Sequence, residues 1–169
     1  MRARLTLEVT DRSGATVAAR HAANSVMRQG AALVADLFRG AGNPITHMGV
    51  GTSDAPDSDA FDTAGLTNEA AGGQPALTGA TEVAIPPEAF GEPQIDDAKR
   101  VVHVRFRATL PDSSAVGTVR EAGLLSRPEG GDPVLYNRVT FAPVQKADDH
   151  ELTLFWEVSF PYGDLHWLP

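Results

Sequence analysis

The chain has 169 residues, enough for one domain with a hydrophobic core of its own. Acidic residues outnumber basic ones 22 to 14, and the resulting net charge of −8 argues against direct contact with nucleic acid or an anionic membrane surface. The absence of cysteine excludes disulfides and thiolate metal sites, and no apolar run reaches the roughly 20 residues needed for membrane insertion.

The N-terminal part predicts a hairpin followed by a helix. Apolar residues alternate over 4–9, turn residues follow at 11–14, and a second extended segment covers 16–20. From Asn24 onwards, apolar residues recur at spacings of three, four and seven residues, which predicts one amphipathic helix over about 25–39. Asn24 would be its N-cap, and Gly40 would lie just past its end. Gly30 either weakens this helix by about 1 kcal/mol relative to alanine or marks close packing against a strand.

The middle of the chain is less regular. Residues 45–51 predict a short strand, and an acidic loop follows at 53–62. Residues 72–93 are rich in Gly, Pro and Ala, so we expect an irregular, exposed excursion there, interrupted by the more strand-like 81–85.

The C-terminal half returns to strict alternation. Residues 99–110 and 151–160 each place an apolar side chain at every second position, and 119–125 and 133–141 predict two further strands. In the last strand the predicted buried residues are Leu152, Leu154, Trp156, Val158 and Phe160. We therefore expect a single, mainly β domain over 1–169, an antiparallel β-sandwich or open barrel with one N-terminal helix.

No cluster of residues predicts catalysis or cofactor binding. The histidines lack the spacing of metal ligands, and neither a nucleophile elbow nor a phosphate-binding loop occurs, so we expect no enzyme. The acidic loop gives weak candidates for a cation site, but it lacks the glycine and final glutamate of a calcium loop, so a solvated loop is favoured. These candidates are Asp54, Asp57, Asp59 and Asp62.

Two features of the sequence are candidates for contacts at the protein surface: a row of basic side chains and a bulky C-terminal segment. Basic side chains follow the outer face of 99–110 and later strands, and we favour a solvated face or cross-strand pairs with Glu121 and Glu157 over an anion site. These side chains are Lys99, Arg105, Arg107, Arg120 and Arg138. The segment 162–169 follows the last strand and is too short to form a core, so its bulky residues are expected to dock on this domain or on another subunit. They are Tyr162, Leu165, Trp167 and Leu168.

The order of several short segments carries a resemblance. Asn24-Ser-Val-Met-Arg-Gln-Gly, Ile45-Thr-His-Met-Gly-Val-Gly-Thr-Ser-Asp-Ala-Pro, Val119-Arg-Glu-Ala-Gly-Leu-Leu, Asn137-Arg-Val-Thr-Phe-Ala-Pro-Val and the closing alternating strand follow one another over about 20–160. In this order they resemble small virion proteins of tailed bacteriophages, of the tail-fibre or baseplate type, with similar versions in phage-derived contractile injection systems.

The resemblance implies a structural module without cofactor or reaction. Such a protein would be made in the host cytoplasm, reside in the virion, and bind copies of itself and other tail proteins. The excursion at 72–93 is longer and the tail at 162–169 extends further than the group leads one to expect, and both suit contacts with neighbours. An alternative is a fibre-tip module that binds a host-surface glycan through exposed aromatics such as Tyr162 and Trp167.

Overall fold

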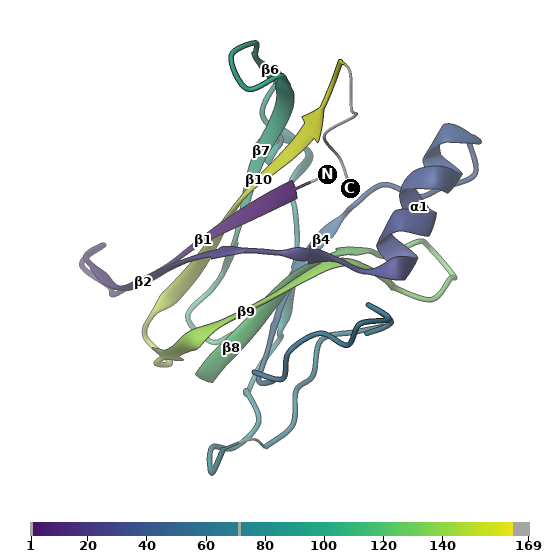
Figure 1. Ribbon diagram of the computed structural model, residues 1–169. Helices are drawn as coiled ribbons and strands as arrows, with labels where there is room; N and C mark the ends of the chain where they lie inside the picture. Colours follow the sequence, from purple (N-terminus) through teal and green to yellow (C-terminus); the bar gives the residue numbers. More distant parts are fainter. Residues whose placement is uncertain (1, 71, 164–169) are drawn as a thin grey trace.

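The computed structural model describes residues 2–70 and 72–163 of the chain. Ten strands form two antiparallel sheets of five, and neither sheet closes into a barrel, which confirms the mainly β class (Figure 1). Sheet A contains, in spatial order, β2 (Thr16–Ala23), β1 (Arg2–Thr10), β10 (Glu151–Pro161), β7 (Val101–Leu110) and β6 (Gln94–Asp96). Sheet B contains, in the same way, β3 (Ser25–Val26), β9 (Val134–Lys146), β8 (Gly117–Ser126), β4 (His47–Gly51) and β5 (Glu82–Ala84).

One apolar core joins the inner faces of the two sheets. Sheet A contributes the alternating residues of β1, β7 and β10, and sheet B contributes those of β4, β8 and β9. Trp156 on β10 is 1% exposed and is the largest fully buried side chain. Because side chains alternate between the faces of a strand, the predicted pattern of β10 places its large residues in this core.

The prediction for β10 fails only at its end. Leu152, Leu154, Trp156 and Val158 are buried, whereas Phe160 is 39% exposed. Within the described residues, the register of β1 on β10 is given up to the pair of Arg2 with Ser159, and Phe160 is the next residue of β10.

The N-terminal hairpin and the single helix are present, although the helix starts later than predicted. β1 pairs with β2, and α1 covers Arg28–Phe38 because Ser25 and Val26 pair with β9 as strand β3. The side chain of Asn24 accepts a hydrogen bond from the Ala3 amide at 2.8 Å instead of capping the helix. With 11 residues, α1 is well short of a bilayer span, and no helix in 2–70 or 72–163 is long and apolar enough to be one.

Gly30 and Gly40 occupy the positions predicted for them in α1. Gly40 has φ +69°, the left-handed conformation that ends many helices. A Cβ at position 30 would come within 2.0 Å of the Tyr136 carbonyl oxygen on β9. The absence of a side chain at Gly30 thus allows α1 to lie directly on sheet B.

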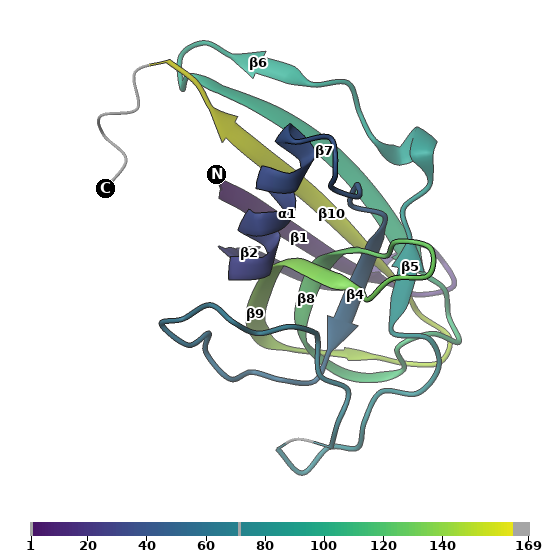
Figure 2. The ribbon, with the colours of Figure 1, turned by 90° about the vertical axis from the view of Figure 1, so that its right-hand side faces the viewer.

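Most residues of the segment 72–93 are exposed and lie outside regular structure, as predicted, and the strand-like part 81–85 forms a short strand. The segment contains β5, which pairs with β4, and the single-turn helix η1 (Pro87–Ala89). Leu77 and Ile85 are buried in the main core at 4% and 6% exposure. The loop between β4 and β5 projects away from both sheets at the bottom of Figure 2, and residues 72–81 of this segment belong to it.

Candidate functional site

The two most distinctive short segments of the sequence lie side by side. β4 carries Gly49-Val-Gly51 and β8 carries Glu121-Ala-Gly123, and the strands pair in antiparallel register. Gly51 lies opposite Glu121, and Gly49 lies opposite Gly123. The glycines and Glu121 thus share the face of sheet B that points away from the core.

A buried ion network is built on this face. The carboxylate of Glu121, fully buried, accepts hydrogen bonds from Arg138 Nε at 2.5 Å and from the Thr67 amide at 2.8 Å. Arg138, on the adjacent strand β9, also donates to Asp57 Oδ1 at 2.8 Å and to the Ala55 carbonyl at 2.9 Å. Three sequence-distant segments therefore meet at one guanidinium.

The network keeps Arg138 charged although its side chain is only 4% exposed. Burial lowers the pKa of the guanidinium, but hydrogen bonds with Asp57 and Glu121 outweigh that effect and raise the pKa above its usual value. A buried ion without a partner is strongly unfavourable, so a charged group that is removed from water must be paired with an opposite charge and hydrogen-bonded.

The glycines of β4 and β8 allow the loop backbone to approach the sheet. A Cβ at Gly51 would lie 2.3 Å from Glu121 Oε1 and 2.5 Å from the Thr67 carbonyl oxygen. A Cβ at Gly49 would lie 2.8 Å from the Leu66 side chain. Small residues at these positions therefore make room for residues 66–67 directly above the strands.

Further hydrogen bonds close the loop, which we call the clamped loop (residues 52–77). The Thr52 amide donates to the Thr67 carbonyl at 2.8 Å. The Asn68 amide group both accepts from the Leu77 amide and donates to the Leu77 carbonyl, at 2.7 and 3.1 Å. The base of the clamped loop is thus fixed on sheet B, while its far end projects into solvent (Figure 2).

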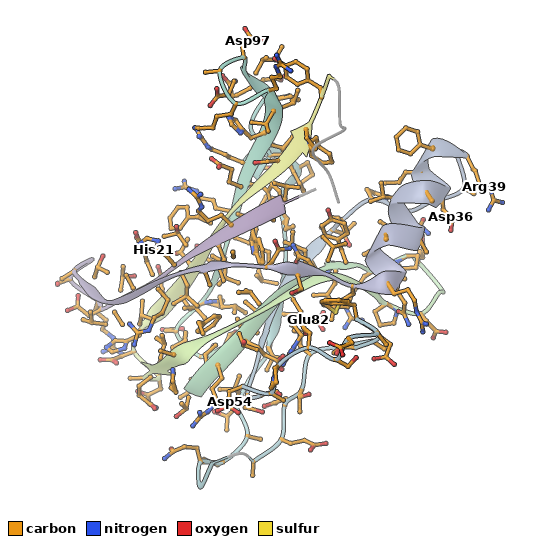
Figure 3. All side chains as sticks on the ribbon, viewed as in Figure 1. His21, Asp36, Arg39, Asp54, Glu82 and Asp97 are labelled. Atoms are coloured by element: carbon orange, nitrogen blue, oxygen red, sulfur yellow. The ribbon has the colours of Figure 1, made fainter. Side chains whose placement is uncertain are left out.

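The four aspartates proposed as weak cation candidates do not converge. Asp54, labelled in Figure 3, pairs with Arg120 at 2.7 Å. Asp57 pairs with Arg138, and Asp62 accepts a hydrogen bond from the Ser58 hydroxyl at 2.8 Å. Asp59 is exposed. No group of three acidic or histidine side chains within 2–70 and 72–163 is placed to hold a metal ion.

The predicted basic face is confirmed in one part and wrong in another. Arg105 forms the expected cross-strand pair with Glu157 at 2.7 Å, and this hydrogen bond lowers the pKa of the Glu157 carboxyl. Arg138 pairs with Glu121 as predicted, but the pair is buried and not solvated. The reason is the clamped loop, which covers that face of sheet B.

The start of the predicted aromatic tail contacts its own chain. The Tyr162 hydroxyl lies 2.5 Å from Asp97 Oδ1, in the turn between β6 and β7, and the Tyr162 amide donates to the Arg100 carbonyl. Asp97 is labelled at the top of Figure 3. Leu165, Trp167 and Leu168 lie outside the described residues, so their interface role stays a prediction.

The buried network itself is the feature that sequence reasoning missed. A signal was present, because Glu121 directly precedes the apolar or small residues 122–125, and Arg138 is followed by the apolar Val139. Charged residues in such positions are usually paired when they are buried. The charged groups of the network, Arg138, Glu121 and Asp57, are paired with one another, and none of the three is left as a free nucleophile or base. The network therefore serves to fix the clamped loop.

No protein-family model, curated protein or solved structure matches this chain.

Proposed function

We propose that this protein is a non-enzymatic structural subunit of a bacteriophage tail or phage-like particle, in the baseplate, a fibre or a fibre attachment. Its partners would be copies of itself and other tail proteins, and it would need no cofactor. The observation that carries the proposal is the buried network of Glu121 and Arg138. Through the bond from Arg138 to the Ala55 carbonyl it joins three of the segments on which the resemblance to virion proteins rests.

A fixed projecting loop suits repeated contacts between subunits. Ordering a loop at the moment of binding costs affinity, and a loop that is already held in place avoids that cost. In the clamped loop, partly buried hydrogen bonds at the base provide this order. Its exposed residues include Asp59 and Phe61, and the Phe61 carbonyl accepts a hydrogen bond from the Arg28 amide at 2.8 Å.

Other exposed features could serve further contacts. Phe38, at the end of α1, is 91% exposed, and Ile95, on the edge strand β6, is 68% exposed. An edge strand offers unpaired backbone groups to a neighbouring chain, and exposed apolar side chains mark contact surfaces when they lie beside such groups.

The test is to find the chain in particles. Phage or phage-like particles from the strain that encodes it would be purified by density gradient, and their proteins quantified by mass spectrometry. We expect a fixed copy number per particle and loss of intact tails when the gene is deleted. Normal particles without the chain would contradict the proposal.

A variant would then locate a contact. Phe38→Ser removes an exposed ring without opening the core, and Gln29→Ser alters an exposed residue of the same helix as a matched control. If the end of α1 is a subunit contact, Phe38→Ser should complement the deletion poorly while keeping wild-type thermal stability, and Gln29→Ser should complement it fully.

A further inference from the structure

The outer face of sheet A carries a wide groove, far from the clamped loop. Its volume is about 980 Å³, and its lining comes from β1, β10 and β7 together with residues of the segment 83–91. Among the lining residues on the outer face are three arginines, two threonines and one phenylalanine. They are Arg4, Thr6, Arg105, Arg107, Thr109 and Phe155.

The strand register arranges these side chains in two rows across the groove. In the first row Arg4, Glu157 and Arg105 lie opposite one another on β1, β10 and β7. The second row, two residues further along each strand, consists of Thr6, Phe155 and Arg107. Neighbours within a row are about 5 Å apart, and the rows are about 7 Å apart.

The groove has an excess of positive charge in a protein of net charge −8. Glu157 is paired with Arg105, and the remaining lining carboxylate is Glu88. Arg4 and Arg107 form no ion pair with any residue of the described chain. Arg107 lies beside Phe155, and Arg4 lies in the neighbouring row opposite Glu157. The hydrogen bond with Arg105 lowers the pKa of the Glu157 carboxyl, and the charge of Arg4 contributes a smaller lowering. Both guanidinium groups, those of Arg4 and Arg107, are exposed and within reach of an anionic ligand in the groove.

We propose that this groove binds an oligosaccharide that contains carboxylated sugars, such as a hexuronate chain. Arginine binds carboxylates through two parallel hydrogen bonds, and Arg4 and Arg107 are placed to do so on opposite sides of the groove. The half-buried ring of Phe155 gives a flat apolar surface for the face of a sugar ring, and the hydroxyl of Thr6 can bond sugar hydroxyls.

Other classes of ligand fit less well. A protein partner usually inserts large anchors into deep apolar pockets. Here the outer faces of the strands present charged groups and threonines around one phenyl ring, and the apolar residues Val83, Pro86 and Ala89 line the groove from the segment 83–91. A nucleic acid duplex carries one charge per about 1.7 Å and would meet stronger repulsion from the acidic protein than a short oligosaccharide with one carboxylate per sugar. The inference does not depend on the virion role proposed above, because it concerns a different face of the molecule.

The experiment is isothermal titration of the full chain with a short oligogalacturonate at low salt, beside a malto-oligosaccharide of the same length. We expect binding of the first and none of the second. Arg107→Ala should weaken binding by about tenfold or more, as expected for the loss of a charged hydrogen bond. Arg12→Ala, which removes an equal charge from the exposed β1–β2 turn, is the control and should leave affinity unchanged.

Phe155→Leu tests the stacking surface, because leucine keeps the apolar character and lacks the flat ring. This variant should bind the oligogalacturonate several-fold more weakly, with an unchanged unfolding temperature within a few degrees. Equal affinity for poly-glutamate would overturn the proposal in favour of an unspecific anion surface. Failure to bind oligogalacturonate, or equal losses in Arg107→Ala and Arg12→Ala, would also overturn it.

Discussion

Gly51 and Glu121 lie opposite each other on β4 and β8, and a Cβ on residue 51 would come within 2.3 Å of the Glu121 carboxylate. The lack of a side chain at Gly51 leaves room for the Glu121 carboxylate, and this carboxylate accepts hydrogen bonds from Arg138 and from the Thr67 amide. One missing side chain allows the buried network to form.

Gly51→Ala should therefore destabilise the fold, by about 1–3 kcal/mol, because either the carboxylate or the loop backbone must move. Chemical denaturation measures the change. Gly65→Ala is the matched control, since a Cβ there would meet nothing within 4 Å. Equal stability of the two variants would show that the Glu121 site can relax freely.

Glu121→Gln keeps the shape of the side chain and removes its charge. It leaves Arg138 with one carboxylate partner in a buried site, and we expect a loss of about 3–5 kcal/mol in the free energy of unfolding. Glu157→Gln breaks the more exposed pair with Arg105 and should cost at most about 1 kcal/mol. Comparable losses in both variants would contradict the distinction between a buried and a solvated pair.

Gly30→Ala separates helix propensity from packing. Alanine favours an isolated helix by about 1 kcal/mol, yet its Cβ would collide with the Tyr136 carbonyl. We expect a net loss of stability and a lower unfolding temperature. Gln29→Ala, at an exposed position of the same helix, should have little effect or stabilise slightly. Stabilisation by Gly30→Ala would mean that α1 can shift away from β9.

Trp156→Ala should cost about 3–5 kcal/mol, because it opens a cavity at the centre of the core. Phe160→Ala, four residues along the same strand, should cost about 1 kcal/mol or less because its ring is partly in solvent. Urea unfolding monitored by circular dichroism distinguishes the two. Similar losses would place Phe160 in the core after all.

Tyr136 gives a pH dependence at the alkaline end. Burial raises the pKa of its phenol from 10.0 to about 12, so the folded state favours the neutral form. This contribution to stability is complete below pH 10 and is lost as the pH rises to about 12. Tyr136→Phe cannot ionise, so its stability should fall less over that range in thermal unfolding curves. Parallel curves for the two proteins up to pH 12 would contradict the prediction.

The sequence predicted the parts of the fold that depend on local periodicity. Alternation alone placed β7 and β10 and most of their buried residues, and turn residues placed the first hairpin. It failed where a distant segment decides the outcome. Asparagine is a common N-cap, but the Asn24 side chain accepts a hydrogen bond from the Ala3 amide on β1. The pairing of β3 with β9 keeps Ser25 and Val26 in a strand, so the helix begins only at Arg28.

The candidate site shows the same limit. Arg138 was expected on a solvated face or in a cross-strand pair, and its own strand gives no indication of the loop that covers it. The cover is the clamped loop, about 80 residues away in the sequence, and its position depends on Thr67, Asp57 and the glycines of β4. Patterns in a single sequence carry information on residues that are neighbours along the chain. The contact of Arg138 with the clamped loop joins residues that are far apart along the chain, so no such pattern predicts it.

The place of β10 in sheet A has a consequence for synthesis on the ribosome. β1 with β2 and β6 with β7 form two separate hairpins, and β10 is the strand that lies between them. Sheet A therefore cannot be completed until residues 151–161 have emerged from the exit tunnel, when most of sheet B is already available. During that interval the edges of β1 and β7 that pair with β10 stay unpaired, so a chaperone or a slow translation rate over the preceding residues would affect the yield of folded protein.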